Sequence, residues 1–222
     1  MKNDYVINEI AVILKKYNSV IKAVLFGSRA RGDNTEKSDY DIAVFAPGIT
    51  QAEKLSILNE IDDLNTLHKI DLVFMSEKNI VLNDNIKKDG KVIMDKLEIK
   101  LNNFRNALER LKESITEEEK SNSTVVRDGV IQRFEFTTEL SWKTAREYLL
   151  SLHVMDINSP KTVLKEAYNN NLIDNEEAWL QILTDRNSTS HIYDEDFAKE
   201  IFQRINAEMR LDVFAVHNPG NG

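Results

Sequence analysis

The sequence predicts an α+β unit, in which a mixed sheet packs with helices, followed by an all-α up-and-down helical bundle. Short apolar runs bounded by glycine, proline or polar residues are confined to the first 95 residues, whereas from Lys96 onward apolar residues recur at spacings of three and four. The first pattern is typical of strands and the second of amphipathic helices. With 41% hydrophobic residues and only 3 Pro and 7 Gly, the composition is that of a helix-rich globular protein.

The first unit opens with a helix and continues with short strands separated by turns. Gly27 stops the first strand, and Thr50 and Glu53 form a capping box that starts a helix. The predicted elements are helices over 4–17, 50–67 and 79–88 and strands over 20–26, 40–45, 70–75 and 91–94. They define a predicted domain over residues 1–95.

The second unit is predicted to contain helices only. The polar run 116–123 is expected to end its first helix, and the charged segment 113–120 is predicted to be a solvated loop. Ser159 and Pro160 supply a cap and a first-turn proline for the third helix. The helices are expected from 97 to the polar run, over 125–152, from 160, around 178–183 and around 197–209. Their short links predict a bundle over 96–214, followed by a flexible tail over 215–222.

The bulk numbers exclude several classes of function. A net charge of −8 argues against a broad phosphate-neutralising surface, so any RNA contact has to be local. The absence of cysteine excludes disulfides, thiolate catalysis and Cys-ligated zinc. No apolar run approaches 18 residues and the N-terminus carries no signal-peptide core, so we expect a cytoplasmic protein with no membrane partner.

Three aspartates point to metal-dependent chemistry on phosphates. Asp39 and Asp41 are two residues apart at the start of a predicted strand and therefore share one face of the pleat, while Asp71 lies in the next strand. Three acids on one side of a sheet repel one another unless cations lie among them, and Mg²⁺ prefers carboxylate and phosphate oxygens. Two such ions hold a triphosphate, activate the attacking oxygen and stabilise the leaving pyrophosphate. We therefore expect Asp39, Asp41 and Asp71 to be metal ligands and catalytic residues.

A glycine-serine turn precedes these acids. Gly27 and Ser28 lie between the end of a strand and the start of a helix, where free backbone N–H groups bind phosphate. Arg29 or Arg31 is expected to contact the triphosphate as well. The sequence thus predicts these four residues as the nucleotide-binding part of the site.

The order of these motifs resembles a known family. Gly27-Ser28-Arg29-Ala30-Arg31-Gly32, followed by Ser38-Asp39-Tyr40-Asp41 and Asp71, resembles the minimal nucleotidyltransferases of the polymerase-beta superfamily over about residues 5–95. The resemblance implies an α+β nucleotidyltransferase domain and Mg²⁺- and ATP-dependent transfer of a nucleoside monophosphate, with release of pyrophosphate. The acceptor is not encoded in these residues.

A second constellation lies near the C-terminus. On an unbroken helix Arg186 and His191 would lie about 140° apart, but residues 187–190 are weak helix formers, and 194–196 are typical of an acidic first turn. If a helix ends between Arg186 and His191, the two can converge. Histidine would then act as general base or acid, with the guanidinium holding a phosphate.

The helical part also resembles a known family, the HEPN-type nucleotidyltransferase substrate-binding domains, over about residues 97–212. The family's R-x4-H-x-Y motif is matched by Arg186, His191 and Tyr193. In toxin–antitoxin members the helical domain is an RNase, silenced when the nucleotidyltransferase adds AMP to the motif tyrosine. The resemblance therefore implies Tyr193 as modification acceptor, RNA as a partner, and a homodimer through the helical domain. The other matching segments are 127–129, 132–136, 139–143, 158–160 and 185–187.

Three functions remain open at this point. In the first hypothesis, the chain is a nucleotidyltransferase whose acceptor is its own helical domain, in the same chain or across a dimer. In the second, which is compatible with the first, the helical domain is an RNase and the first domain is its built-in inhibitor. Alternatively, the chain is a small-molecule, antibiotic-type nucleotidyltransferase whose helical domain only binds substrate.

Overall fold

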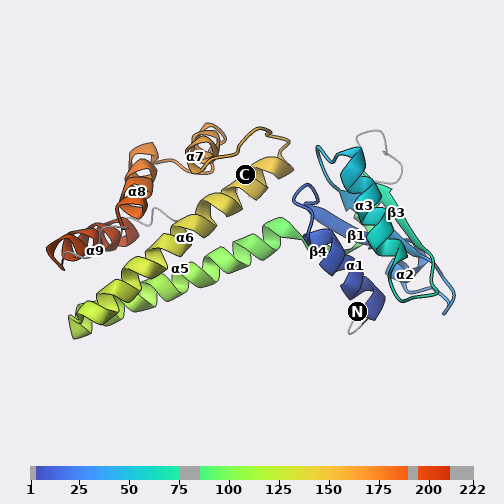
Figure 1. Cartoon of the computed structure of the whole chain (residues 1–222), viewed down its shortest axis with the longest axis horizontal. Coiled ribbons are helices and arrows are strands. Elements are labelled where there is room, and N and C mark those ends of the chain that lie inside the picture. Colours follow the sequence, from blue (N-terminus) through green and yellow to red (C-terminus); the bar gives the residue numbers. More distant parts are fainter. Residues whose placement is uncertain (1–3, 76–85, 190–194, 211–222) are drawn as a thin grey trace. The chain divides into compact units, whose positions relative to one another are not determined.

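The computed structural model describes residues 4–75, 86–189 and 195–210 (Figure 1). The chain divides into two compact units, Met1–Lys96 and Leu97–Gly222. The first contains a four-stranded sheet with helices, and the second contains helices. This is the predicted fold class.

The sheet of the first unit has the strand order β3-β2-β1-β4. Strand β1 pairs antiparallel with both β2 and β4, whereas β2 and β3 run parallel. The parallel pair is joined through helix α3, because parallel strands need a crossover connection. The bounds are β1 Lys22–Phe26, β2 Tyr40–Phe45, α3 Gln51–Asp62, β3 Ile70–Phe74 and β4 Lys91–Asp95. The sheet is therefore mixed, as predicted.

Helices α1 (Tyr5–Lys15) and α3 supply the core on one face of this sheet. Leu25 and Ile42 point to this face and pack with Ile10, Leu14 and Ile57, all fully buried. Alternate strand residues point to the opposite face, where Val24 and Ala43 pack with Ile86. Thr50 caps α3 in the predicted capping box with Glu53. Most of the predicted helix 79–88 lies outside the described residues. The part that is described agrees with the prediction, because residues 86–89 are helical.

In the second unit, two long helices form an antiparallel hairpin, and the remaining described helices pack on α6 (Figure 1). Their core contains Phe104, Leu111, Phe134, Leu149 and Ile182, all buried. The bounds are α5 Lys96–Ser121, α6 Thr124–Ser151, α7 Pro160–Asn169, α8 Glu176–Ser188 and α9 Glu195–Arg210. None of the described helices combines the length and apolarity needed to span a membrane. The predicted tail lies outside the described residues.

One expectation about the first long helix was wrong. Segment 113–120 is not a loop, because α5 continues to Ser121 and ends within the polar run 116–123. Glu and Lys are good helix formers, so a charged run propagates a helix well. Tertiary contacts also anchor this end, since Ile115 lies in the core and Glu118 forms a buried ion pair with Arg127 of α6.

Candidate functional site

Strand pairing brings two of the three predicted acids side by side. Asp41 in β2 is the direct register partner of Asp71 in β3, and Asp39 lies just before β2. Burial, followed by the charges of Asp71 and Asp39, raises the pKa of the Asp41 carboxyl above its usual range. The charges of Asp71 and Asp39 therefore reach the Asp41 carboxyl.

A lysine that sequence reasoning missed lies among these acids. The Lys69 ammonium lies 2.6 Å from Asp71 Oδ2. Its pKa is raised by this hydrogen bond and by the charge of Asp71, with smaller contributions from Asp39 and Asp41. The spacing of the two residues could have predicted this contact, because Lys69 and Asp71 are two residues apart at the start of β3 and therefore share a face.

The chemistry of these donors fits a divalent cation. Three carboxylates offer the hard oxygen ligands that Mg²⁺ prefers. The pKa of Asp41 is raised first by burial and then by repulsion from Asp71 and Asp39, and a cation would relieve that repulsion. Within residues 4–75, 86–189 and 195–210, however, no three His, Cys, Asp or Glu side chains are gathered closely enough to hold a metal ion. The assignment of Asp39, Asp41 and Asp71 as metal ligands stays a prediction.

The backbone of Gly27 lies so close to Asp41 that a side chain at this position would collide with the carboxylate. Its φ of +71° lies in the left-handed region, and a Cβ built on it would lie 2.3 Å from Asp41 Oδ2. Helix α2 (Gly27–Arg31) begins at this glycine. The turn that precedes the helix therefore packs on the carboxylate, while phosphate binding by Gly27 and Ser28 stays a prediction.

Arg29 is committed to the protein itself. Its Nε and Nη2 donate to the carbonyl of Ser38 at 2.9 and 2.7 Å, and its guanidinium lies 3.8 Å from the centre of the Tyr40 ring. Nη2 also lies 3.3 Å from His68 Nδ1. These contacts fix the segment that carries Asp39, which indicates a positioning role rather than direct contact with a triphosphate.

Arg31 has a different environment. Its Nε donates to Asp33 Oδ2 at 3.1 Å, and both side chains are about half exposed. An exposed pair of this kind contributes little to stability, so a phosphate can replace Asp33 at low cost. Of the two arginines, Arg31 is the one available to a triphosphate.

In the second unit, Arg186 lies in the last turn of α8 and its Nη2 lies 3.4 Å from Glu139 Oε2 of α6. Glu139 also pairs with Lys143 at 2.9 Å and accepts a hydrogen bond from the Trp142 indole at 3.0 Å. Desolvation opposes ionisation of Glu139, but the hydrogen bonds from Lys143 and Trp142 and the nearby charges outweigh it and lower its pKa. Sequence reasoning did not link Glu139 and Trp142 to Arg186.

The helix break predicted after Arg186 is confirmed. Helix α8 ends at Ser188, and α9 begins at Glu195 with an acidic first turn. His191 and Tyr193 lie outside the described residues, so the convergence of Arg186 with His191 stays a prediction.

Two family matches together cover most of the chain. Residues 8–99 match the family described as "Polymerase beta, Nucleotidyltransferase", and residues 99–213 match "Nucleotidyltransferase substrate binding protein like". A curated protein of Haemophilus influenzae, "Probable ribonuclease HepT", is 36% identical over 81 residues. That alignment covers 35% of this chain and 56% of the relative, so the chain spans about half the length of the curated relative it matches.

Solved structures show weaker likeness. A crystal structure of a Thermus thermophilus protein has 38% identity, a TM-score of 0.44, and coverage of 49% of this chain and 91% of its own. A toxin-antitoxin structure with AMP-PNP has 21% identity, and one of a mutant toxin-antitoxin MntA-HpeT has 19%. Both have a TM-score of 0.35 and cover 52% of this chain and 98% of their own. With TM-scores below 0.5, these structures indicate nothing about the function of this chain.

Proposed function

The chain belongs to the nucleotidyltransferase substrate-binding-protein-like family and carries a polymerase-beta-type nucleotidyltransferase domain in front of it, and we propose that it transfers AMP from ATP to its own helical unit. The observation that carries this proposal is the pairing of Asp41 with Asp71, with Asp39 just before β2 and Gly27 packed on Asp41. This arrangement concentrates negative charge next to a turn with no side chain in the way.

Each residue of the first unit has a distinct part in this proposal. Asp39, Asp41 and Asp71 would hold two Mg²⁺ ions, which when bound neutralise the triphosphate and assist the attacking and leaving oxygens. Arg31 and the Gly27-Ser28 turn bind the phosphates, and Arg29 holds the segment that carries Asp39. Lys69 pairs with Asp71, and in this proposal its charge would pass to the leaving pyrophosphate once a metal ion binds Asp71.

The acceptor in this proposal is the phenol oxygen of Tyr193. That oxygen attacks the α-phosphorus of ATP and loses its proton, the bond from the α-phosphorus to the bridging oxygen breaks, and pyrophosphate leaves. Arg186 and His191 belong to an RNase site that the AMP group silences, which would make the chain a single-chain toxin–antitoxin protein. The likeness to a relative named a probable ribonuclease supports the second activity.

Intact-mass spectrometry tests the transfer. The full chain is incubated with ATP, with and without Mg²⁺, and the expected result is a gain of one or more AMP units that requires Mg²⁺. Tyr193→Phe should lose the adduct, whereas Tyr168→Phe, which alters an exposed tyrosine of α7, should keep it. An adduct that persists in Tyr193→Phe contradicts the acceptor. Pyrophosphate release only on addition of an aminoglycoside or a nucleotide acceptor, without a mass gain, supports the small-molecule alternative.

A further inference from the structure

Two neighbouring hollows on the surface of the second unit have lining residues in common, and Arg186 is one of them. One is a cavity of about 330 Å³ with Trp142, Lys161 and Thr184 in its lining. The other, of about 500 Å³, includes Glu135, Phe136 and Thr189. Glu139, Arg186 and Asn187 line both. Each volume lies in the range of small-ligand sites and suits one nucleotide.

Each hollow offers one aromatic ring. Trp142 is half-buried in the first, and Phe136 is 42% exposed in the second. An exposed phenylalanine is unusual on a helix whose neighbours Phe134 and Thr137 are fully buried. Aromatic rings on which single bases stack are the common feature of sites for single-stranded nucleic acid, because every base has a π-face.

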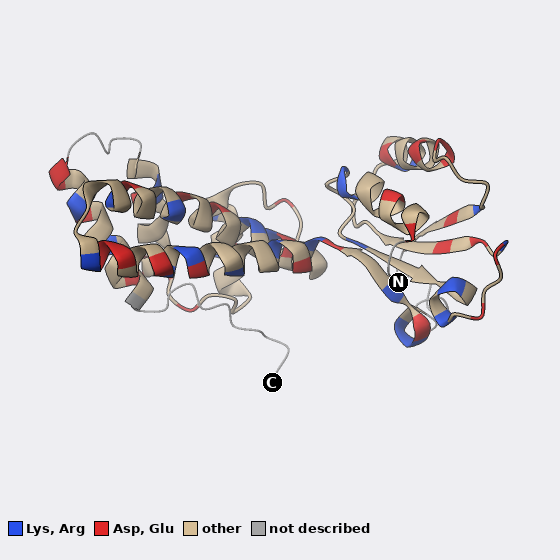
Figure 2. Cartoon of the chain, turned by 90° about the horizontal axis from the view of Figure 1, so that it is seen from below, with Lys and Arg blue, Asp and Glu red and all other residues tan. Residues whose placement is uncertain are grey.

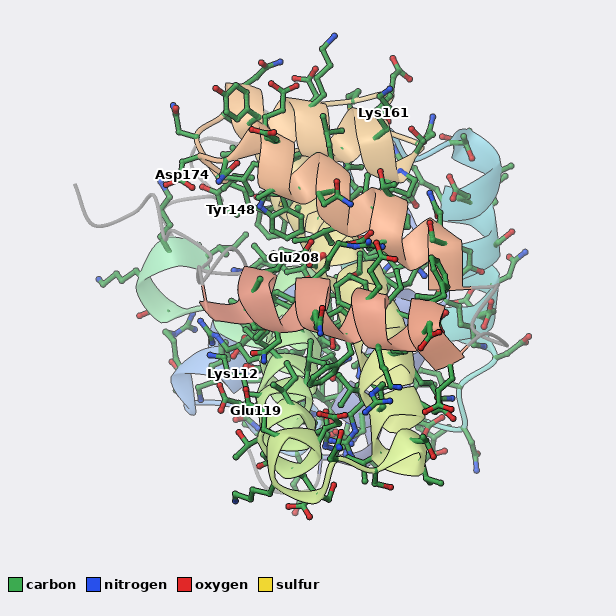
Figure 3. The ribbon with its side chains drawn as sticks, turned by 90° about the vertical axis from the view of Figure 1, so that its left-hand side faces the viewer. Lys112, Glu119, Tyr148, Lys161, Asp174 and Glu208 are labelled. Carbon is green, nitrogen blue, oxygen red and sulfur yellow. The ribbon has the colours of Figure 1, made fainter. Side chains whose placement is uncertain are left out.

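Positive charge is local to these hollows. The Arg186 guanidinium lies on the shared wall, and its bond to Glu139 is long, at 3.4 Å, with the Arg186 side chain 43% exposed. Lys161 is exposed at the outer surface of the bundle (Figure 3), and no ion pair is found for it in the described part of the chain. Elsewhere on the second unit acidic and basic residues are interspersed along the helices (Figure 2). So small a positively charged region suits a short single-stranded nucleic acid rather than a duplex.

The acidic side chains in the walls are already engaged. Glu139 is neutralised by Lys143 and Arg186, and Glu135 accepts a hydrogen bond from the Thr189 hydroxyl. Carboxylates in such positions accept hydrogen bonds from the amino groups of bases. Since they flank the aromatic rings, they suit base edges, while Arg186 suits the phosphate.

We propose that the two hollows bind successive bases of single-stranded RNA, one on Trp142 and one on Phe136, with the connecting phosphodiester at Arg186. Lys161 contacts the next phosphate on the Trp142 side. The proposal rests on the RNase activity proposed above and names the part of the strand that this site recognises. It places the phosphate between the bases next to the helix end from which the R-x4-H-x-Y motif continues.

Fluorescence anisotropy with a labelled oligonucleotide carrying 2′-O-methyl riboses tests the proposal, because such a strand binds without being cleaved through its 2′-hydroxyl. The full chain is titrated without ATP or Mg²⁺, so transferase activity has no part in the signal. Trp142→Leu and Phe136→Leu should each weaken binding roughly 5- to 100-fold, the effect of losing one stacked base. The matched control is Tyr168→Leu, an aromatic residue of α7 that is 43% exposed and lines neither hollow.

Charge is tested in the same assay. Lys161→Ala should weaken binding and flatten its dependence on salt, whereas Lys165→Ala, one helical turn further along α7, should change neither. Because Phe136 is exposed, its substitution leaves the fold intact even if Trp142→Leu does not.

Equal affinity of the Phe136→Leu and Tyr168→Leu proteins, or no binding of the oligonucleotide at all, would overturn the proposal. Specific binding of the modified strand, with no cleavage of its unmodified counterpart, would refute the RNase activity and leave the base subsites standing. A concentration-dependent dimer that excludes the oligonucleotide would assign these hollows to a second copy of the chain, and would also overturn it.

Discussion

The two units differ in where they keep their charges. In the described part of the first unit, the buried residues are apolar apart from Lys96 at its end. The second unit buries charges between helices, including the pairs Glu118–Arg127 and Asp185–Arg204. It also buries Glu208, whose carboxylate oxygens have no hydrogen-bond partner among the residues that the structure describes.

This difference indicates two ways of using charge. In the first unit the core is stabilised by apolar burial, so the acids stay at the ends of strands, where they repel one another and remain available for chemistry. In the second unit buried pairs join particular helices, because a charge removed from water is tolerated only opposite its partner. They therefore help to fix how α5 aligns with α6, which carries Glu139, and how α9 aligns with α8, which carries Arg186.

The largest expected effect is on a buried pair. Arg127→Ala leaves Glu118 as an uncompensated buried charge, and both side chains are only 5% exposed. It should lower the free energy of unfolding by about 3 to 5 kcal/mol. Both tryptophans, Trp142 and Trp179, lie in the second unit, so urea unfolding followed by tryptophan fluorescence reports on that unit.

The matched control for this change is Lys199→Ala, which removes an exposed partner of Glu195 in α9 and should cost less than about 1 kcal/mol. Similar losses for the two variants would show that burial does not set the strength of these pairs.

Removal of an acid from the first unit should lower activity without lowering stability. Asp41→Asn should lower the rate of AMP transfer roughly 10²- to 10³-fold, the usual cost of removing one charge-stabilising group from a reaction centre. Its effect on stability should be neutral or favourable, because repulsion from Asp71 and Asp39 is removed. Pyrophosphate release and thermal unfolding measure the two quantities, with Asp62→Asn on the exposed side of α3 as control. A lost fold in place of lost activity would contradict this.

Glu208 makes the stability of the second unit depend on pH. Burial raises its pKa to about 8, with a further contribution from the charge of Asp185, and Figure 3 shows it on α9 next to the ribbon of α8. Between the unfolded pKa near 4.5 and the folded value, the folded state binds more protons, so stability falls as pH rises through this window and levels off above it.

Glu208→Gln, which mimics the protonated acid, should therefore match the native chain at pH 5 and exceed its stability by on the order of 3 kcal/mol at pH 9. Urea midpoints from tryptophan fluorescence at both pH values provide the comparison. A constant difference between the two proteins at all pH values would rule out titration of Glu208.

The smallest expected effect is on the kinetics of transfer, where substitution of Arg29 and of Arg31 in α2 should change different parameters. Arg29→Lys loses the two bonds to the Ser38 carbonyl and the stacking on Tyr40, so it should lower kcat for transfer about tenfold with little change in KM for ATP. Arg31→Lys should instead raise KM. Steady-state pyrophosphate release measures both parameters, and the reverse pattern would exchange the two roles.

Much of the fold follows from local patterns. The short apolar runs of the strands, the Thr50 and Ser159 caps, and the helix end after Arg186 are properties of neighbouring residues, and the structure confirms each. The prediction of a loop over 113–120 was wrong, because whether a charged run forms a loop or a helix depends on what packs against it. The contact between Glu118 and Arg127 has no local signature.

The sequence by itself determined the order of two unlike units, the strands of the first unit and the positions of three aspartates along them, because periodicity and spacing are carried by the chain. Only the tertiary structure decided that Arg29 holds the Asp39 segment, that the charges of Asp39 and Asp41 reach Lys69, and that Arg186 lies between two hollows. These are distances between residues far apart in sequence, and they are set by packing rather than by any residue's own preference.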